Sequence, residues 1–316
     1  MVRKLERKYA RPEEMPVNCE PQRWEEWEVG IQMGPVEYRI KPSTHLKHCD
    51  LLNSHLPWFE TEWNLFPWEL IGWARAISQY YGRLNGGIQP SFRSEFYKPA
   101  KVGQPLFATH FNVEKFIKRG KKFCSVRDET RDENGVLLQK TDSANVFLAD
   151  AGDDFEFGSS KRHNEGRWDD LGEHVTASKD LSDGLVLLTM TKGPCPMRVS
   201  GFSHGGWSLD EWRNNIHEDG FSQKLGYAGG VVEGPIAWEY GQLDQLVLFF
   251  GADRFFTSGI VDVKVCGPTY LGDTLIAKAR VREKLPEDGG VRLVLDTRIE
   301  KPDGSLVNVG TASALL

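Results

Sequence analysis

The chain has 316 residues, of which 40% are hydrophobic and 27% are charged. These values are ordinary for a globular protein, and they exclude collagen-like, disordered and disulfide-scaffold classes. The chain carries 39 Lys and Arg against 45 Asp and Glu, so its net charge is −6 at pH 7 with His counted as neutral. A mildly acidic chain lacks the basic surface that nucleic-acid-binding proteins need. The length predicts two domains or one long one.

The cysteines predict a reducing compartment, because they are odd in number, scattered and without a Cys-x-x-Cys pair. They are Cys19, Cys49, Cys124, Cys195 and Cys266. No apolar run approaches the roughly 20 residues that cross a bilayer. The first residues, MVRKLERKYARPEEM, lack the apolar region of a secretory signal. We therefore predict a cytoplasmic protein that binds neither a membrane nor nucleic acid.

The sequence contains an internal repeat. A Pro-x-x-x-Gly-x-x-Leu pattern occurs twice, at Pro99, Gly103 and Leu106 and again at Pro268, Gly272 and Leu275. The offset between the two occurrences is 169 residues (272 minus 103). Gly135 and Gly304, in a later turn of each half, keep the same offset without a gap. An offset that holds through two turns predicts two copies of one unit.

Each copy is predicted to contain an apolar helix, at residues 67–81 in the first copy and 235–250 in the second. Apolar residues recur one and three positions apart in both segments, which is the spacing of a helix with a buried face. A proline at the start of each segment suits the first helical turn. Additional aromatic residues widen the apolar surface, so each helix is expected to be buried nearly all round.

Strands are predicted after each helix, at 89–97, 106–116, 122–131 and 136–147 in the first copy and at 259–265, 275–281, 291–298 and 306–312 in the second. Their period-two alternation, with Asn-Gly and Asp-Gly turns, predicts antiparallel hairpins. Residues 36–40 and 185–191 are expected to be the first strands of the two copies. A long buried helix wrapped by a bent antiparallel sheet is an α+β unit.

The residues between the two copies are rich in Gly, Asp, Glu and Ser, which predicts a connection on the surface. We therefore divide the chain into an N-terminal repeat at residues 1–150, a linker at 151–182 and a C-terminal repeat at 183–316.

This order of elements resembles a double hot-dog protein, and the second copy resembles the MaoC-like hydratase/dehydratase family. The resemblance covers residues 30–316 and is carried by NNIHED at 214–219, GYAGGVVEGP at 226–235 and PTYLGD at 268–273. In that family an Asp-x-Asn-Pro-aliphatic-His pattern precedes a Gly-rich turn and the central helix. The resemblance implies a lyase that hydrates an enoyl thioester, or dehydrates a 3-hydroxyacyl thioester, linked to coenzyme A.

The catalytic pattern of the family is altered in this chain. Counting back from His217, Ile216 and Asn214 fit the family pattern, whereas Asn215 replaces the Pro and Trp212 stands where the family has Asp.

In the first copy, the segment 53–59 has Pro57 at the Pro position, but Ser54 replaces the Asp and Phe59 replaces the His. The resemblance therefore implies that the first copy is not catalytic.

The resemblance implies that His217 acts as general base or acid, a role that suits the near-neutral pKa of imidazole. Glu233 or Asp210 is expected to replace the missing Asp. Gly234 is expected to begin the second central helix. The resemblance implies that its N–H donates a hydrogen bond to the thioester oxygen. The predicted catalytic residues are His217, Glu233 and Asp210, and the predicted substrate-binding residues are Asn214, Gly234 and Trp212.

Three alternative functions remain open at this stage. A hot-dog thioesterase would need a carboxylate beside the central helix, which Glu233 or Glu239 would supply. A non-catalytic acyl-binding module is consistent with the missing Asp. A specialised lyase or isomerase would reuse the scaffold with other acid and base groups.

The expected ligand is a small acyl thioester, bound between the two central helices with apolar walls from both copies. His45, His48 and Cys49 share one helix face, but no second group of ligands stands at a metal-binding spacing, so no metal site is predicted. Coenzyme A is expected only as part of the substrate, with no separate cofactor. A homodimer is expected because ten Trp and seventeen Phe imply additional buried surface.

Overall fold

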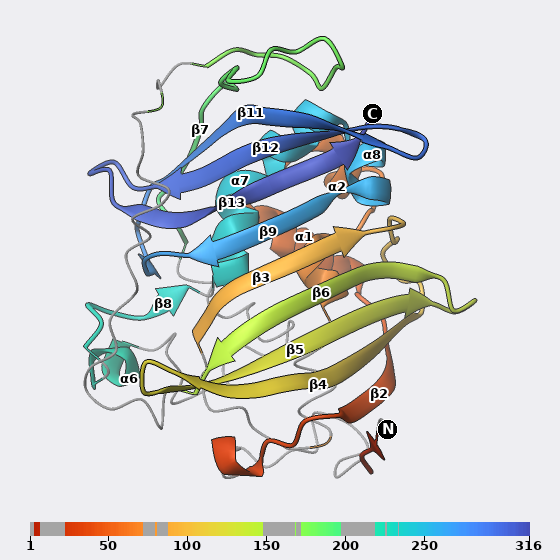
Figure 1. The fold of residues 1–316 in the computed structure, drawn as a ribbon, viewed down its shortest axis with the longest axis vertical. Coiled ribbons are helices and arrows are strands. Elements are labelled where there is room, and N and C mark those ends of the chain that lie inside the picture. The colour runs from red at the N-terminus through yellow and green to blue at the C-terminus, as the bar shows by residue number, and fades with distance from the viewer. Residues whose placement is uncertain are drawn as a thin grey trace.

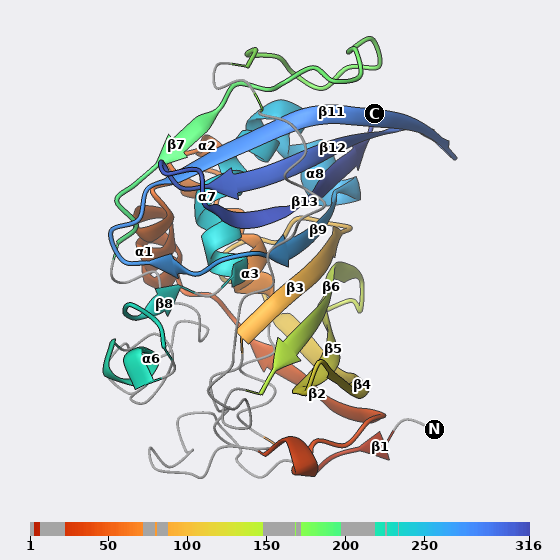
Figure 2. The same cartoon turned by 60° about the vertical axis from the view of Figure 1, so that its left-hand side comes forward.

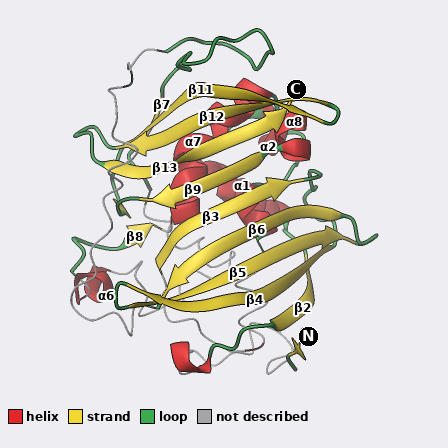
Figure 3. Cartoon of the chain, viewed as in Figure 1, coloured by secondary structure: helices red, strands yellow, loops and turns green. Residues whose placement is uncertain are grey.

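The computed structural model describes residues 3–6, 23–71, 80, 88–147, 168, 172–196, 219–224, 226–232 and 234–316. Its main feature is one large, curved and mostly antiparallel sheet with helices on its concave side (Figures 1 and 2). The strand order in this sheet is β1-β2-β4-β5-β6-β3-β9-β13-β12-β11-β7. Figure 3 shows the same division between one layer of strands and the helices behind it.

The first half of the sheet comes from the first copy. Its strands are β1 (Arg3–Lys4), β2 (Ile31–Tyr38), β3 (Ile88–Phe96), β4 (Leu106–Lys118), β5 (Lys121–Asp132) and β6 (Leu137–Val146). Its described helices are the short η2 (Trp24–Glu26), α1 (Pro42–Leu52), α2 (Pro57–Glu60) and α3 (Pro67–Leu70).

The second half comes from the second copy. Its strands in the large sheet are β7 (Met190–Lys192), β9 (Ile260–Val265), β11 (Leu275–Glu287), β12 (Gly290–Glu300) and β13 (Leu306–Leu315). Its described helices are α6 (Asp219–Lys224), α7 (Gly234–Phe250) and α8 (Ala252–Ser258). A small second sheet pairs β8 (Val231–Val232) with β10 (Thr269–Tyr270).

The strand boundaries confirm the repeat that the sequence predicts. The strands β4, β5 and β6 begin at residues 106, 121 and 137, and β11, β12 and β13 begin 169 positions later, at 275, 290 and 306. A β-bulge also recurs at this offset, after Asn112 in β4 and after Val281 in β11. The two copies therefore share their irregularities as well as their strands.

The paired glycines of the repeat make the same turn in both copies. Gly103 and Gly272 have φ angles of +84° and +79°, a left-handed conformation that glycine adopts without strain. The N–H of Gly103 donates to the carbonyl of Ile40, and the N–H of Gly272 donates to the carbonyl of Cys195. Each glycine thus ties the turn before β4 or β11 to the chain that follows the first strand of its copy.

The helix α7 confirms the prediction for residues 235–250 and is buried on nearly every side. It packs in the concavity of the second half of the sheet, where Leu243 and Leu246 belong to one continuous apolar cluster. Val175, Ala177 and Leu181, from the segment predicted as a linker, pack against the same cluster.

The predicted helix at residues 67–81 is wrong at Ile71. The helix α3 begins at Pro67 but ends at Leu70, because Ile71 is extended, with ψ at 101°. The hydroxyls of Tyr38 and Thr130 both donate to the carbonyl of Leu70, so side chains and not a following helical turn satisfy this group. Residues 72–79 lie outside the described residues.

The predicted strand at 185–191 is shorter in the structure. Only Met190–Lys192 forms a strand beside β11, while Val186 and Leu187 make single bridges to Arg280 and Glu173. Within the described part of the chain, no helix combines the length and apolar character that a bilayer crossing requires.

Candidate active site

Only one of the six predicted site residues lies in the described part of the chain. Gly234 is the first residue of α7. The other five, His217, Glu233, Asp210, Asn214 and Trp212, lie outside the described residues. The described part of the candidate site comprises Gly234, the chain on either side of the undescribed residues, and the buried polar groups along α7.

Close packing requires a glycine at the start of α7. A Cβ atom on Gly234 would lie 2.5 Å from Cγ2 of Val265 and 3.3 Å from the carbonyl oxygen of Gln89. No described residue accepts a hydrogen bond from the N–H of Gly234. The first N–H groups of a helix carry a partial positive charge and lack partners within the helix. The start of α7 can therefore donate a hydrogen bond to an oxygen that carries negative charge.

The chain that follows His217 in the sequence is attached to the chain that leads into α7. Asp219 begins α6, and its Oδ1 accepts a hydrogen bond of 2.7 Å from the N–H of Gly230. Directly after Gly230, the strand β8 pairs with β10, and Val232 lies opposite Thr269. Figure 1 shows α6 beside β8. This brings the start of α6 close to the residues that immediately precede Gly234.

A buried imidazole–carboxylate pair joins α1 of the first copy to α7 of the second. Nε2 of His48 lies 3.0 Å from Oε2 of Glu239, and both residues are buried. Oε1 of Glu239 accepts a hydrogen bond of 2.9 Å from the N–H of Trp68. Burial raises the pKa of Glu239, although His48 acts in the opposite direction. Both carboxylate oxygens are thus already bound, which leaves Glu239 as an anchor for the packing of α1 and argues against the thioesterase role considered for it.

A second buried contact fixes the chain after α1 to the same helix. Oδ1 of Asp244 accepts a hydrogen bond of 2.7 Å from the hydroxyl of Ser54, and Oδ2 accepts one of 2.6 Å from Nζ of Lys192. Nζ of Lys192 also donates to the carbonyl of Leu52. Ser54, which stands where the family has a catalytic Asp, therefore binds α7.

His45 forms a third buried pair, with Glu69 of α3. Its Nδ1 donates to Oε2 of Glu69 at 2.8 Å, and its Nε2 donates to the carbonyl oxygen of Phe59 at 3.0 Å. Burial by itself lowers the pKa of His45, but contacts with Cys49 and Glu69 outweigh it and raise the pKa to about 10. His45 is therefore a buried cation that neutralises Glu69.

Sequence reasoning placed His45 and His48 on one helix face but missed their partners. The partner of His45 is 24 positions away and the partner of His48 is 191 positions away, so no local spacing signals them. Each of these imidazoles contacts a carboxylate, Glu69 for His45 and Glu239 for His48. Across the described residues, no three His, Cys, Asp or Glu side chains are arranged to hold a metal ion.

The comparisons with known proteins bear on the fold of the chain. No protein-family model matches the sequence, and no curated protein matches it. A solved MaoC-like dehydratase is 11% identical and superposes with a TM-score of 0.68, over 93% of this chain and 100% of that chain. This chain has the double hot-dog fold. The fold and the structural resemblance that the sequence predicts are both confirmed.

Two further double hot-dog comparisons give the same result. A Mycobacterium tuberculosis protein described as having this fold is 14% identical, with a TM-score of 0.62 over 93% of this chain and 98% of its own. A MaoC-like dehydratase from Phytophthora capsici is 12% identical, with a TM-score of 0.58 over 90% and 94%. In the double hot dog of this chain, α7 is the central helix of the second copy, and the segment that includes α1 lies across it.

Proposed function

We propose that this double hot-dog chain adds water to an enoyl thioester, or removes water from a 3-hydroxyacyl thioester, with coenzyme A as the thiol carrier. The observation that carries the proposal is the start of α7, where the N–H of Gly234 binds no described residue. The fold supports it, since solved MaoC-like dehydratases share the whole architecture.

The proposed chemistry is an acid–base reaction at the two carbons next to the thioester. In dehydration, a base removes the proton from carbon 2, and the electron pair moves onto the thioester oxygen as an enolate. The N–H of Gly234 stabilises that oxygen, because the donor is fixed before the charge develops. An acid then protonates the hydroxyl on carbon 3, and the electron pair of the enolate returns to form the double bond between carbons 2 and 3 as water leaves. Hydration is the same sequence reversed.

His217 is proposed as the group that moves the proton, and Glu233 or Asp210 as the carboxylate that works with it. Asn214 and Trp212 are proposed to contact the substrate. The thioester itself acidifies the proton on carbon 2, so this proposal gives no role to a metal or a redox cofactor. We also propose that the protein is a homodimer, which light scattering at micromolar concentration tests directly.

The test is turnover of a panel of enoyl-coenzyme A thioesters, followed as loss of the enoyl absorbance. We expect His217→Ala to lower turnover by at least about 100-fold, the lower end of what a general acid–base group contributes. His174→Ala is the matched control, since His174 is exposed and lies in another part of the chain. Full activity of His217→Ala would contradict the proposed mechanism.

A further inference from the structure

A row of polar side chains crosses the inner face of the first-copy sheet. Direct register joins one residue from each of four neighbouring strands, His110 on β4, Asp128 on β5, Thr141 on β6 and Ser94 on β3. We call these four residues the polar row. All four are buried, with His110 at 0% exposure.

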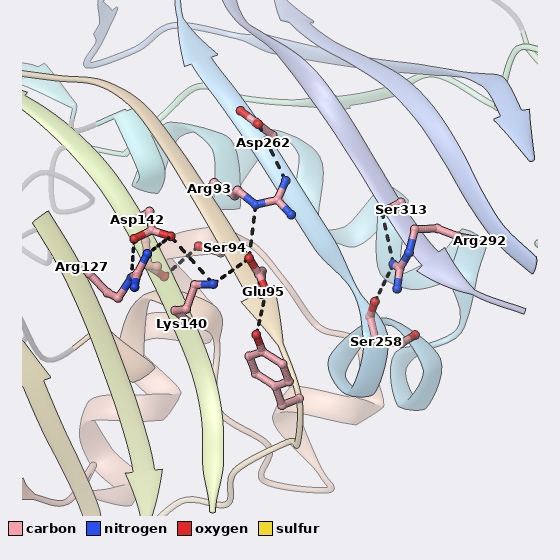
Figure 4. Close-up of polar contacts among 12 residues, drawn as sticks. Arg93, Ser94, Glu95, Arg127, Lys140, Asp142, Ser258, Asp262, Arg292 and Ser313 are labelled. Carbon is pink, nitrogen blue, oxygen red and sulfur yellow. Dashed lines mark hydrogen bonds and ion pairs between the residues drawn. The ribbon is translucent and has the colours of Figure 1, made fainter. Parts of the chain in front are cut away.

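The residues next to the polar row face the opposite side of the sheet. Arg127 on β5 and Asp142 on β6 form an ion pair, and Lys140 bonds Glu95 of β3 on the same outer face (Figure 4). These neighbours are partly exposed, whereas the residues between them are buried. Since side chains alternate along a strand, the polar row lies on the side that faces the interior.

The polar row has hydrogen-bonding capacity that no other described residue satisfies. Nδ1 of His110 lies 2.8 Å from Oδ1 of Asp128, and the hydroxyls of Ser94 and Thr141 are 2.9 Å apart. Nε2 of His110 is buried and has no hydrogen-bond partner among the described residues. The same holds for Oε1 of Gln139, whose Nε2 donates to Thr141. Buried polar atoms without partners are rare in folded proteins and call for an explanation.

The fold does not require polar residues in this row. The counterparts 169 positions later are Ala279, Thr297, Gly310 and Val263, which form the same register across β11, β12, β13 and β9. In the second copy these small or apolar residues leave space for α7, and Ala279 belongs to the continuous apolar cluster around that helix. The same four scaffold positions thus carry four polar side chains in the first copy and only one, Thr297, in the second.

The polar row also divides the apolar core of the first copy. Val126, on one side of it, belongs to a cluster with Tyr80, whereas Leu138, on the other side, belongs to a separate cluster with Leu70. This face of the first copy therefore carries a strip of polar side chains between two apolar clusters. A plain hydrocarbon chain placed here would leave Nε2 of His110 unpaired.

We propose that the polar row is the floor of the acyl-group subsite, and that the acyl group carries a hydroxyl beyond carbon 3 that donates to Nε2 of His110. The carboxylate of Asp128 accepts the proton on Nδ1, which fixes the tautomer whose Nε2 carries a lone pair. Asp128 is a positioning residue, since it acts through His110. This inference rests on the proposed action on acyl thioesters and deepens it by naming the substrate class.

The test is binding, so that it does not depend on turnover. Isothermal titration of the full chain compares hexanoyl-coenzyme A with hydroxyhexanoyl-coenzyme A thioesters that carry the hydroxyl on carbon 4, 5 or 6. These saturated thioesters lack the enoyl group. We expect at least one hydroxylated thioester to bind about 10-fold or more tightly than hexanoyl-coenzyme A, the effect of one satisfied buried hydrogen bond.

The variant His110→Ala/Asp128→Thr places in the first copy the residue types found at Ala279 and Thr297 in the second. We expect this variant to bind the hydroxylated thioesters and hexanoyl-coenzyme A with the same affinity. Replacing both partners of a buried hydrogen bond by residues that leave no group unpaired can be nearly neutral for stability. Arg127→Ala, on the outer face beside Asp128, is the control and should keep the preference. If the double variant does not fold, the single variants His110→Gln and Asp128→Asn, which preserve side-chain volume, take its place and should each weaken the preference.

Equal binding of all the thioesters by the unchanged protein would overturn the inference, because a water molecule would then be the partner of His110. Survival of the preference in the double variant would overturn it too. Failure of the proposed function gives a different result, in which the preference for a hydroxylated chain is present but enoyl thioesters are not hydrated.

Discussion

Arg93 and Asp262 face each other across the centre of the sheet, and each is the counterpart of the other in the repeat. Asp262 lies 169 positions after Arg93, and the register of β3 with β9 pairs them directly. Nη1 of Arg93 is 3.9 Å from Oδ2 of Asp262 (Figure 4). On either side, Phe92 pairs with Val263 and Ser94 with Val261. The pseudo-two-fold axis of the molecule therefore passes between Arg93 and Asp262, and joins the two copies into one sheet.

The ion pair on this axis is expected to contribute little to stability, because both side chains are about half exposed, at 43% and 58%. Such surface pairs are worth about 1 kcal/mol or less. Phe92, on the buried face of the same joint, has its ring 5.7 Å from that of Trp238. We expect Asp262→Ala to lower the free energy of unfolding by less than about 1 kcal/mol and Phe92→Ala by about 3–5 kcal/mol. Urea unfolding measures both, and similar losses in the two variants would contradict this account of the joint.

The Lys192–Asp244 pair should behave as a buried salt bridge. Lys192→Met removes the cation but leaves the Asp244 carboxylate buried, so we expect a loss of about 3–5 kcal/mol in the free energy of unfolding. Lys192→Met/Asp244→Leu removes both charges and should recover part of that loss. A double-mutant cycle in urea tests the coupling. If the losses of the two single variants simply add, the two charges do not depend on each other.

The His45–Glu69 pair predicts a loss of stability at alkaline pH. The pKa of His45 is raised from 6.5 to about 10 in the folded protein, so the folded state holds a proton that the unfolded state releases in that interval. The stabilisation is complete below pH 6.5 and is lost as the pH rises toward 10, by up to about 1.4 kcal/mol per pH unit. Thermal unfolding between pH 6.5 and 8, below the range in which thiols titrate, should show this slope in the unchanged protein and a flatter one in His45→Gln. A stability that rises over this interval would contradict the charged state of His45.

Position 234 is expected to accept a side chain only if Val265, which packs against it, is replaced by a smaller residue. Gly234→Ala puts a Cβ atom 2.5 Å from Cγ2 of Val265, so we expect it to destabilise the chain. Gly234→Ala/Val265→Ala removes that contact and keeps the N–H at the start of α7, so both stability and any hydratase activity should largely return. Loss of activity in a stably folded double variant would show that the N–H donor is not what makes this position important.

The sequence was sufficient to predict the elements that depend on local patterns. The 169-residue offset predicted equivalent turns at Gly103 and Gly272, and the structure confirms them. Period-two alternation located β4 and β11 but ended both strands early, at residues 116 and 281 instead of 118 and 287. In β11 the predicted strand stops at Val281, where a bulge shifts the alternation. The helix that begins at residue 67 was predicted to continue past Leu70. It ends there because the hydroxyls of Tyr38 and Thr130 bind the carbonyl of Leu70, and helical spacing in the sequence carries no information on these contacts.

The buried polar pairs depend on contacts between distant parts of the chain. The sequence placed His48 on one helix face with His45 and Cys49, but its bond to Glu239 exists only because α1 lies across α7. The polar row likewise depends on strand register. His110 and Asp128 are 18 positions apart in the sequence and become neighbours only through the pairing of β4 with β5. The residues singled out from the family pattern stay a prediction, apart from the position of Gly234 at the start of α7.

The most direct test of the proposed reaction is to incubate the purified chain with an enoyl-coenzyme A thioester in water labelled with heavy oxygen, and to determine the products by mass spectrometry. The account predicts one labelled oxygen in the acyl group of an intact 3-hydroxyacyl thioester, with loss of this product in His217→Ala. Label in a free carboxylic acid, together with released coenzyme A thiol, would contradict it and show a thioesterase.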